Sequence, residues 1–195
     1  SPLRLSVAFI KNSGNYAVNG WWWYQGTSAQ IKSYLSQNNA RLIDIERFVV
    51  NGSNRYYAVM IKNSGDHAKA WWYYLGVSLD ALKASIARNN ARIVDLESYK
   101  VGGKTVYSAV LIRNTGIDKA GWWWYLNTTL STITSKLKAN NARPIDINRR
   151  SSGRYDVVMK RKAGQGWFHY YGSTSTSIVN NYKQEGARIV DIEPY

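Results

Sequence analysis

The stretch NNARIVDLE, which runs from Asn89 to Glu97, recurs along the chain and decides how the sequence is divided. Its counterparts are NNARLIDIE from Asn38, NNARPIDIN from Asn140 and EGARIVDIE from Glu185. The Ala-Arg pairs inside these stretches stand at 40/41, 91/92, 142/143 and 187/188, which are 51, 51 and 45 residues apart. Self-similarity at such a period is typical of repeat architectures, so we interpret residues 1–195 as a single repeat domain of four units.

Three strands are predicted in each unit. β-Branched and aromatic residues dominate the segments 91–99, 105–113 and 121–126. Gly, Asn and Asp residues separate the three segments, which is the composition expected of strands and the turns between them.

A helix is predicted after each third strand. Leu79, Leu82 and Ile86 recur at helical spacing behind a capping residue, Ser78, and the same pattern begins at Thr129 in the next unit. In the fourth unit the helical pattern is weaker and lies in a Ser/Thr-rich segment. The residues just past the helices tolerate the left-handed conformation of a C-terminal cap. These residues are Asn39, Asn90, Asn141 and Gly186.

The two ends of the chain complement each other. Residues 3–11, LRLSVAFIK, match the second strand of a unit, and residues 187–195, ARIVDIEPY, match the first strand. Pairing of these two segments would close the array and remove exposed sheet edges. The predicted fold is therefore an α+β ring of four βββα units of about 50 residues with pseudo-fourfold symmetry. An open right-handed βα superhelix is the alternative.

All nine tryptophans lie in four short aromatic clusters, GWWWY at 20–24 and 121–125, AWWYY at 70–74 and GWFHYY at 166–171. Because alternate residues of a strand point to opposite faces, each cluster divides into two sets. The set at the third and fifth residues of each of these stretches is predicted to face the core. Its members are Trp22, Trp72, Trp123, Phe168, Tyr24, Tyr74, Tyr125 and Tyr170.

The opposite set permits two interpretations. Trp, Tyr and His interchange at one of its positions, which is typical of a half-wet surface on which sugar rings or bases stack. The other interpretation is a second apolar layer. The members of this set are Trp21, Trp71, Trp122, Trp167, Trp23, Tyr73, Trp124 and His169, followed by Gln25, Leu75, Leu126 and Tyr171.

The order of WWWY cluster, helix, NNARIVDLE (89–97) and YAVMIKNSG (57–65) resembles a known repeat. It is similar to the bacterial tandem-repeat module that accompanies secreted serine hydrolases. It also resembles the Trp-rich N-terminal repeat domain of fungal polyglycine hydrolases. The resemblance extends over essentially the whole chain and implies a secreted, non-catalytic accessory module, since in that family the hydrolase activity belongs to a separate domain.

The net charge of +14 favours a polyanionic partner, such as nucleic acid or an acidic polysaccharide. The absence of cysteine excludes disulfides and thiolate chemistry, and no run of apolar residues is long enough to cross a membrane. A denser basic patch is interpreted either as a polyanion site or as a solvated hairpin. Its residues are Arg149, Arg150, Arg154, Lys160, Arg161 and Lys162.

Carboxylates recur two residues apart in the predicted first strands. Such pairs serve glycoside hydrolysis or calcium binding, but repetition in every unit favours salt bridges to Arg and Lys of the neighbouring strand. The histidines, His67 and His169, occupy unrelated positions, so no metal set is predicted, and neither is a cofactor or an enzymatic activity. The pairs are Asp44 with Glu46, Asp95 with Glu97, and Asp191 with Glu193, while Asp146 is followed by Asn148.

The sequence therefore favours a monomeric, lectin-like module that binds a glycan or cell-wall polymer in several places, more tightly through the first three units than the fourth. A scaffold that binds a protein partner and a nucleic-acid-binding protein are the alternatives. The predicted ligand-binding residues come from the aromatic clusters and the loops before them. They are Trp21, Trp23, Trp71, Tyr73, Trp122, Trp124, Trp167, His169, Asn63, Asp66, Lys69, Asn114, Asp118 and Lys119.

Overall fold

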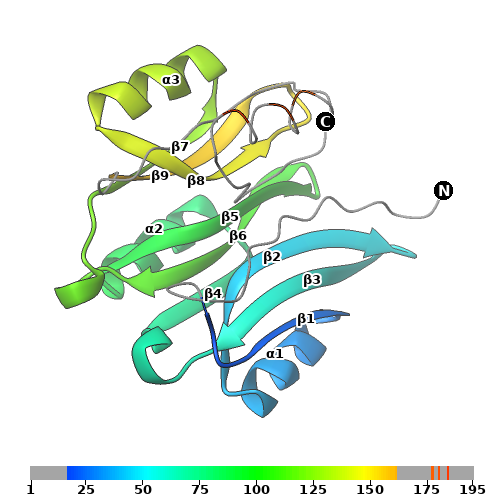
Figure 1. Ribbon diagram of the computed structural model, residues 1–195. Helices are drawn as coiled ribbons and strands as arrows, with labels where there is room; N and C mark the ends of the chain where they lie inside the picture. The colour runs from blue at the N-terminus through cyan, green and yellow to red at the C-terminus, as the bar shows by residue number, and fades with distance from the viewer. Residues whose placement is uncertain (1–16, 162–176, 178–179, 181–183, 185–195) are drawn as a thin grey trace.

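The computed structural model describes residues 17–161 and positions 177, 180 and 184. Within them the order strand, helix, strand, strand occurs three times (Figure 1). The first unit contains β1 (Trp21–Gly26), α1 (Ser28–Gln37), β2 (Ala40–Val50) and β3 (Ser53–Lys62). After the short 3-10 helix η2 (Gly65–His67), the second contains β4 (Trp71–Val77), α2 (Leu79–Arg88), β5 (Ala91–Val101) and β6 (Lys104–Arg113). After η3 (Gly116–Asp118), the third contains β7 (Trp122–Thr128), α3 (Leu130–Ala139), β8 (Ala142–Arg149) and β9 (Tyr155–Arg161).

Each unit forms one antiparallel sheet whose last strand lies in the centre, in the orders β1-β3-β2, β4-β6-β5 and β7-β9-β8. The α+β repeat character is as predicted, but the sheets divide the repeat at a different place. Strand β7 was expected to complete the sheet of β5 and β6, whereas it pairs with β9. The helix carries the chain from the aromatic strand to the following hairpin, so the structural unit is βαββ and not βββα.

A bulge interrupts each strand that carries the Ala-Arg pair. In β5 the register against β6 shifts between Ile93 and Asp95, and β2 and β8 have the same shift. Arg92 lies opposite Ile112, and Asp95 lies opposite Val110. Because those two partners are two residues apart, Arg92 and Asp95 share a face although they are three apart in sequence.

The helices begin and end as the sequence predicts. Ser78 Oγ accepts from the Ala81 N–H at 3.2 Å, and Thr129 caps α3 in the same way. Asn39, Asn90 and Asn141 have φ of 45°, 46° and 46°, the left-handed conformation of a C-terminal cap.

The asparagine that precedes each left-handed cap has a separate function, which the sequence did not indicate. Its Nδ2 donates to the hydroxyl of the last tyrosine of the aromatic cluster, at 3.1–3.3 Å. The three bonds join the end of each helix to the edge strand of its own sheet. The pairs are Asn38 with Tyr24, Asn89 with Tyr74, and Asn140 with Tyr125.

The predicted core face of the aromatic strands is confirmed in the three described units. Trp22 and Tyr24 pack on the core of α1 and its sheet, which includes Ile31, Leu35 and Met60. The second and third units repeat this packing. Trp72, Tyr74, Trp123 and Tyr125 are the equivalent residues, while Phe168 and Tyr170 lie outside the described residues.

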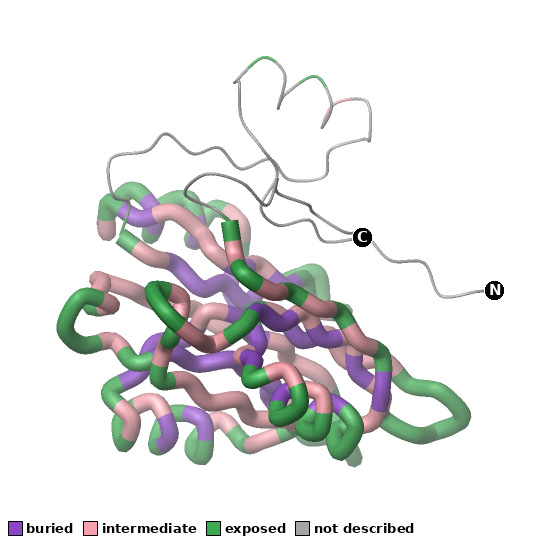
Figure 2. The backbone as a smooth tube through the Cα atoms, turned by 60° about the horizontal axis from the view of Figure 1, so that its bottom comes forward, coloured by how far each residue is buried: buried purple, intermediate pink, exposed green. Residues whose placement is uncertain are grey.

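The opposite face of each later sheet covers the core of the preceding unit. Trp71, Tyr73 and Leu75 pack against the first core together with Val110 of β6. Trp122, Trp124 and Leu126 pack against the second core with Val158 of β9. An apolar layer therefore joins consecutive units, and buried residues run through the middle of the molecule while loops and hairpin ends are exposed (Figure 2).

No sheet closes on itself within residues 17–161. The predicted four-unit ring involves residues 1–16 and most of 162–195, which lie outside the described residues. None of the helices that the structure describes is long and apolar enough to cross a membrane.

Candidate functional site

The loops before the aromatic strands are held by their own asparagines. Asn63 Nδ2 donates to the Lys69 carbonyl oxygen at 3.1 Å, and the Lys69 N–H donates to Asn63 Oδ1 at 2.8 Å. Asn114 makes the same two bonds with Ala120, at 3.0 and 2.8 Å. The amides of Asn63 and Asn114, two predicted ligand-binding residues, are therefore engaged in shaping the loops.

Two other predicted residues meet across neighbouring loops. Lys69 Nζ of the second unit lies 2.7 Å from Asp118 Oδ1 of the third. Arg41 reaches the same row of loops, because its Nε donates to the His67 carbonyl oxygen at 3.4 Å. Asp66 is exposed beside them. The loops of successive units thus form one continuous polar rim.

A cationic hollow of about 370 Å³ lies at the junction of the second and third units. Arg92, Lys119, Lys160 and Arg161 contribute to its lining, together with Asp118. Of these, Asp118 and Lys119 were predicted as ligand-binding residues, and Lys160 and Arg161 as members of the basic patch.

Lys160 departs from the repeat at this place. It lies opposite Trp122 on the neighbouring strand, where the first and second units have Ile61 and Ile112. Both isoleucines are buried. Comparison of the three described units therefore shows a lysine in an otherwise apolar position. This departure can be recognised in the sequence, but Lys160 was not among the predicted ligand-binding residues.

The positive charges of the hollow exceed the negative charge that faces them. Burial lowers the pKa of Lys160, and repulsion by Arg92 and Arg143 lowers it further, while Asp118 opposes this. Burial also lowers the pKa of Arg92, which is 8% exposed and whose Nε has no hydrogen-bond partner. Since Asp118 is already paired with Lys69, the hollow favours an anionic group.

An aromatic hollow of about 400 Å³ lies along the edge strand of the second sheet. Its lining consists of Trp71, Trp72, Tyr73 and Tyr74, so side chains from both faces of β4 reach it. The rings of Trp71 and Tyr73 stack with their centroids 5.7 Å apart. Such half-buried rings with polar tips provide stacking surfaces for a sugar.

The remaining predicted aromatics differ in exposure. Trp21 and Trp23 are 52% and 57% exposed, whereas Trp122 and Trp124 are half-buried against the second unit. The interpretation as an apolar layer therefore describes the second and third units. Of the three sheets that the structure describes, only the first has this face exposed. Trp167 and His169 lie outside the described residues.

The prediction of salt bridges for the repeated carboxylates is wrong for Asp44, Asp95 and Glu97. No Arg or Lys among the described residues forms an ion pair with these three. The bulge places the arginine and the aspartate on one face, but Arg41 extends to the His67 carbonyl instead. The carboxylates instead gather with one another, and burial raises the pKa of Asp44, Asp95 and Glu97.

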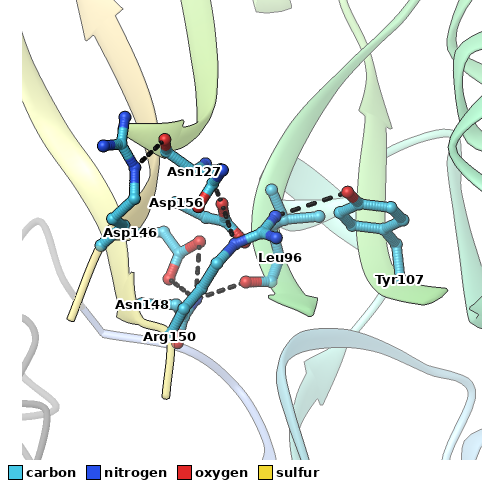
Figure 3. Close-up of polar contacts among 8 residues, drawn as sticks. Leu96, Tyr107, Asn127, Asp146, Asn148, Arg150 and Asp156 are labelled. Carbon is cyan, nitrogen blue, oxygen red and sulfur yellow. Dashed lines mark hydrogen bonds and ion pairs between the residues drawn. The ribbon is translucent and has the colours of Figure 1, made fainter. Parts of the chain in front are cut away.

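The basic patch is divided among several environments, and Figure 3 shows the contacts of Arg150. Arg150 Nε lies 2.8 Å from Asp156 Oδ1, and its guanidinium also donates to the Tyr107 hydroxyl at 3.4 Å. Arg154 Nε donates to the Asn127 carbonyl oxygen at 2.6 Å. Lys160 lines the cationic hollow, so the patch is not a uniform polyanion-binding surface. Lys162 lies outside the described residues.

Comparison with protein-family models finds no match to this chain, and comparison with curated proteins finds none either.

Proposed function

We propose that this chain is a secreted, non-enzymatic, lectin-like module that binds an acidic glycan or cell-wall polymer at the junctions between its units. The observation that supports this most is the cationic hollow beside an aromatic strand. Lys160 is the cross-strand partner of Trp122, and Arg92 is buried in the same hollow without a partner for its Nε. Charge recognises the acid groups of such a polymer, and rings recognise its sugars.

The presence of two hollows on one chain supports a polymeric ligand. The aromatic hollow belongs to the second sheet, and the cationic hollow lies where the third unit meets the second. A chain of sugars that contacts both hollows gains affinity because the second contact becomes intramolecular. Each individual contact remains weak.

Polygalacturonate and its methyl-esterified form test the proposal, since esterification removes the charges and keeps the rings. We expect the acidic polymer to bind more tightly, and Lys160→Ala to weaken binding about tenfold, as loss of a charge-assisted hydrogen bond does. Lys104→Ala, at an exposed hairpin end, is the matched control. Equal binding of the two polymers, or none by the folded protein, contradicts the proposal. Complete displacement by an oligonucleotide assigns the hollow to nucleic acid.

A protein partner is the second candidate function. Ile117 is 99% exposed at the tip of η3 and borders the cationic hollow. An apolar side chain beside charged groups matches the combination of apolar centre and polar rim that protein interfaces have. Ile117→Ser abolishes capture of an acidic protein if that is the partner, and weakens glycan binding less than Lys160→Ala does if the ligand is a polymer.

We also propose that the fourth unit closes the array into a ring by covering the first sheet. The support comes from equivalent positions. Val94 and Tyr73 of the second sheet pack on the preceding core, whereas Ile43 and Trp23, their equivalents in the first sheet, are exposed. A neighbouring unit on this face would bury them as it does in the later sheets.

A further inference from the structure

Three strands bring equivalent carboxylates together beside the junctions of the sheets. Strand β5 contacts both β2 and β8, and it lies between them in Figure 1. Each strand carries its aspartate just after the bulge and on the same face as the preceding arginine. Asp44, Asp95 and Asp146 therefore occupy equivalent positions on three neighbouring strands. Glu46 and Glu97 lie two residues further along β2 and β5, on the same face.

The geometry of the first two units fits a shared cation. One carboxylate oxygen from each of Asp44, Glu46 and Asp95 lies within 4.8 Å of the others. Oxygen ligands of Ca²⁺ lie about 2.3–2.6 Å from the ion, so two ligands on opposite sides are roughly 5 Å apart. The three oxygens are thus close enough to bind one ion.

A second observation concerns the partners of these carboxylates. Asp95 is 6% exposed, and its Oδ2 has no hydrogen-bond partner. Glu97 Oε1, on the same face of β5, is also buried without a partner. A buried carboxylate oxygen without a donor is costly unless a positive charge or a proton satisfies it.

We propose that Asp44, Glu46 and Asp95 bind a calcium ion between the first and second units, with Glu97 as an adjoining ligand. The donors are carboxylate oxygens, which suit Ca²⁺ and not the softer metals that need nitrogen or sulfur. Ca²⁺ accepts a variable ligand geometry, whereas Mg²⁺ requires a near-ideal octahedron, so carboxylates from two separate strands suit Ca²⁺ better. The ion neutralises Asp44, Asp95 and Glu97, which form no ion pair with a basic side chain of the described residues, and it joins two units.

The equivalent place between the second and third units differs, which explains why the site is assigned to one junction. Asn148 stands where the first two units have glutamates. Its Nδ2 donates to both oxygens of Asp146, at 3.2 and 3.3 Å, and to the Leu96 carbonyl oxygen (Figure 3). The amide therefore supplies to Asp146 the positive partner that a cation supplies to Asp95.

Calorimetric titration with calcium chloride, after EDTA treatment and dialysis, tests the site on the intact chain. We expect one Ca²⁺ per chain, no comparable heat from magnesium chloride, and a higher Tm in calcium than in EDTA. Asp95→Asn should weaken calcium binding roughly 10- to 100-fold or more. Asp80→Asn, an exposed acidic residue in the first turn of α2, is the control and should bind as the wild type does.

Two results would overturn the inference. One is a wild-type protein that is folded but shows neither heat nor a Tm difference with calcium. The other is an Asp95→Asn protein that is more stable than the wild type even in calcium. That result would mean that the wild-type carboxylates share protons and bind no metal. If Asp95→Asn fails to fold, Glu46→Gln replaces it, with the same loss of calcium binding expected. Polymer binding through the cationic hollow is measured separately and does not decide this outcome.

Discussion

At the scale of single residues, Lys160 shows how a site arises within a repeat. Its equivalents Ile61 and Ile112 are buried, so the position itself is apolar. Placing an ammonium group there loses apolar burial and brings it near Arg92 and Arg143. A residue that reduces stability in this way at one of the three described repeats is expected where a ligand supplies the missing negative charge.

Replacing Lys160 by isoleucine should therefore stabilise the protein while weakening its binding to an acidic polymer. The expected gain is about 1–2 kcal/mol in the free energy of unfolding, since one apolar side chain becomes buried and one repulsion disappears. Urea denaturation measures the first effect and polymer binding the second. Lys160→Arg, which keeps the charge, should gain no stability. A destabilised Lys160→Ile protein would show that the lysine has a structural partner.

The difference in free energy of unfolding between the wild type and Lys160→Ile should change with pH in the alkaline range. Burial lowers the pKa of Lys160, so the native state releases this proton at lower pH than the unfolded chain does. The free energy of unfolding of the wild type therefore rises with pH between the folded pKa of Lys160 and its unfolded value of about 10.4. The difference in stability between the two proteins narrows accordingly. Unfolding in urea at a series of alkaline pH values measures the gap. A constant gap would contradict the lowered pKa.

At the scale of elements, the second asparagine of each NNA motif fixes where the helix ends. Asn90 has φ of 46°, which is the left-handed conformation. This conformation costs an ordinary residue such as alanine roughly 1–2 kcal/mol. Asn90→Ala should lose about that much stability, whereas Asn90→Gly should stay within about 0.5 kcal/mol of the wild type. Thermal and urea unfolding of both variants compare the two. Equal losses would mean that the asparagine side chain, and not the backbone conformation, is what matters.

Alternation along the aromatic clusters predicted the two faces correctly, because the register shifts of β4 and β7 follow Tyr74 and Tyr125 and leave the period of two intact within each cluster. The carboxylate cluster could not be predicted in the same way. Arg92 and Asp95 are three apart, so simple alternation places them on opposite faces, and no glycine or proline marks the bulge that brings them together. The bulge of β2 is likewise unmarked, so the grouping of Asp44 and Asp95 was not predicted, whereas Pro144 stands at the bulge of β8 and was a signal that went unused.

At the scale of the whole molecule, the predicted repeat length is confirmed for the described units, but the predicted boundary between units is wrong. A periodic sequence has the same period wherever it is cut, so the spacing of the Ala-Arg pairs cannot show that β7 pairs with β9. The cationic hollow was missed because it combines Arg92 of one unit with Lys160 of the next. Contacts between units depend on how the units stack, which the repeat pattern does not contain.

Closure of the ring has a mutational test. If a fourth unit covers the first sheet, Trp23→Ala should reduce the free energy of unfolding about as much as Tyr73→Ala, by roughly 2 kcal/mol or more. If the first sheet faces water, Trp23→Ala should change it by no more than about 0.5 kcal/mol. Urea denaturation compares the two variants, and Val101→Ala at an exposed hairpin end controls for loss of an exposed apolar side chain. A Trp23→Ala protein as stable as this control would exclude closure.

The central position of the last strand in every sheet has a consequence for biosynthesis. In the first unit β1 and β2 each pair with β3 and not with one another. A nascent chain that has emerged from the ribosome only as far as β2 therefore holds two strands and a helix with no ladder between the strands. The sheet becomes complete only when β3 follows, so each unit joins the growing structure in a single step, and translation sets the order in which the junctions form.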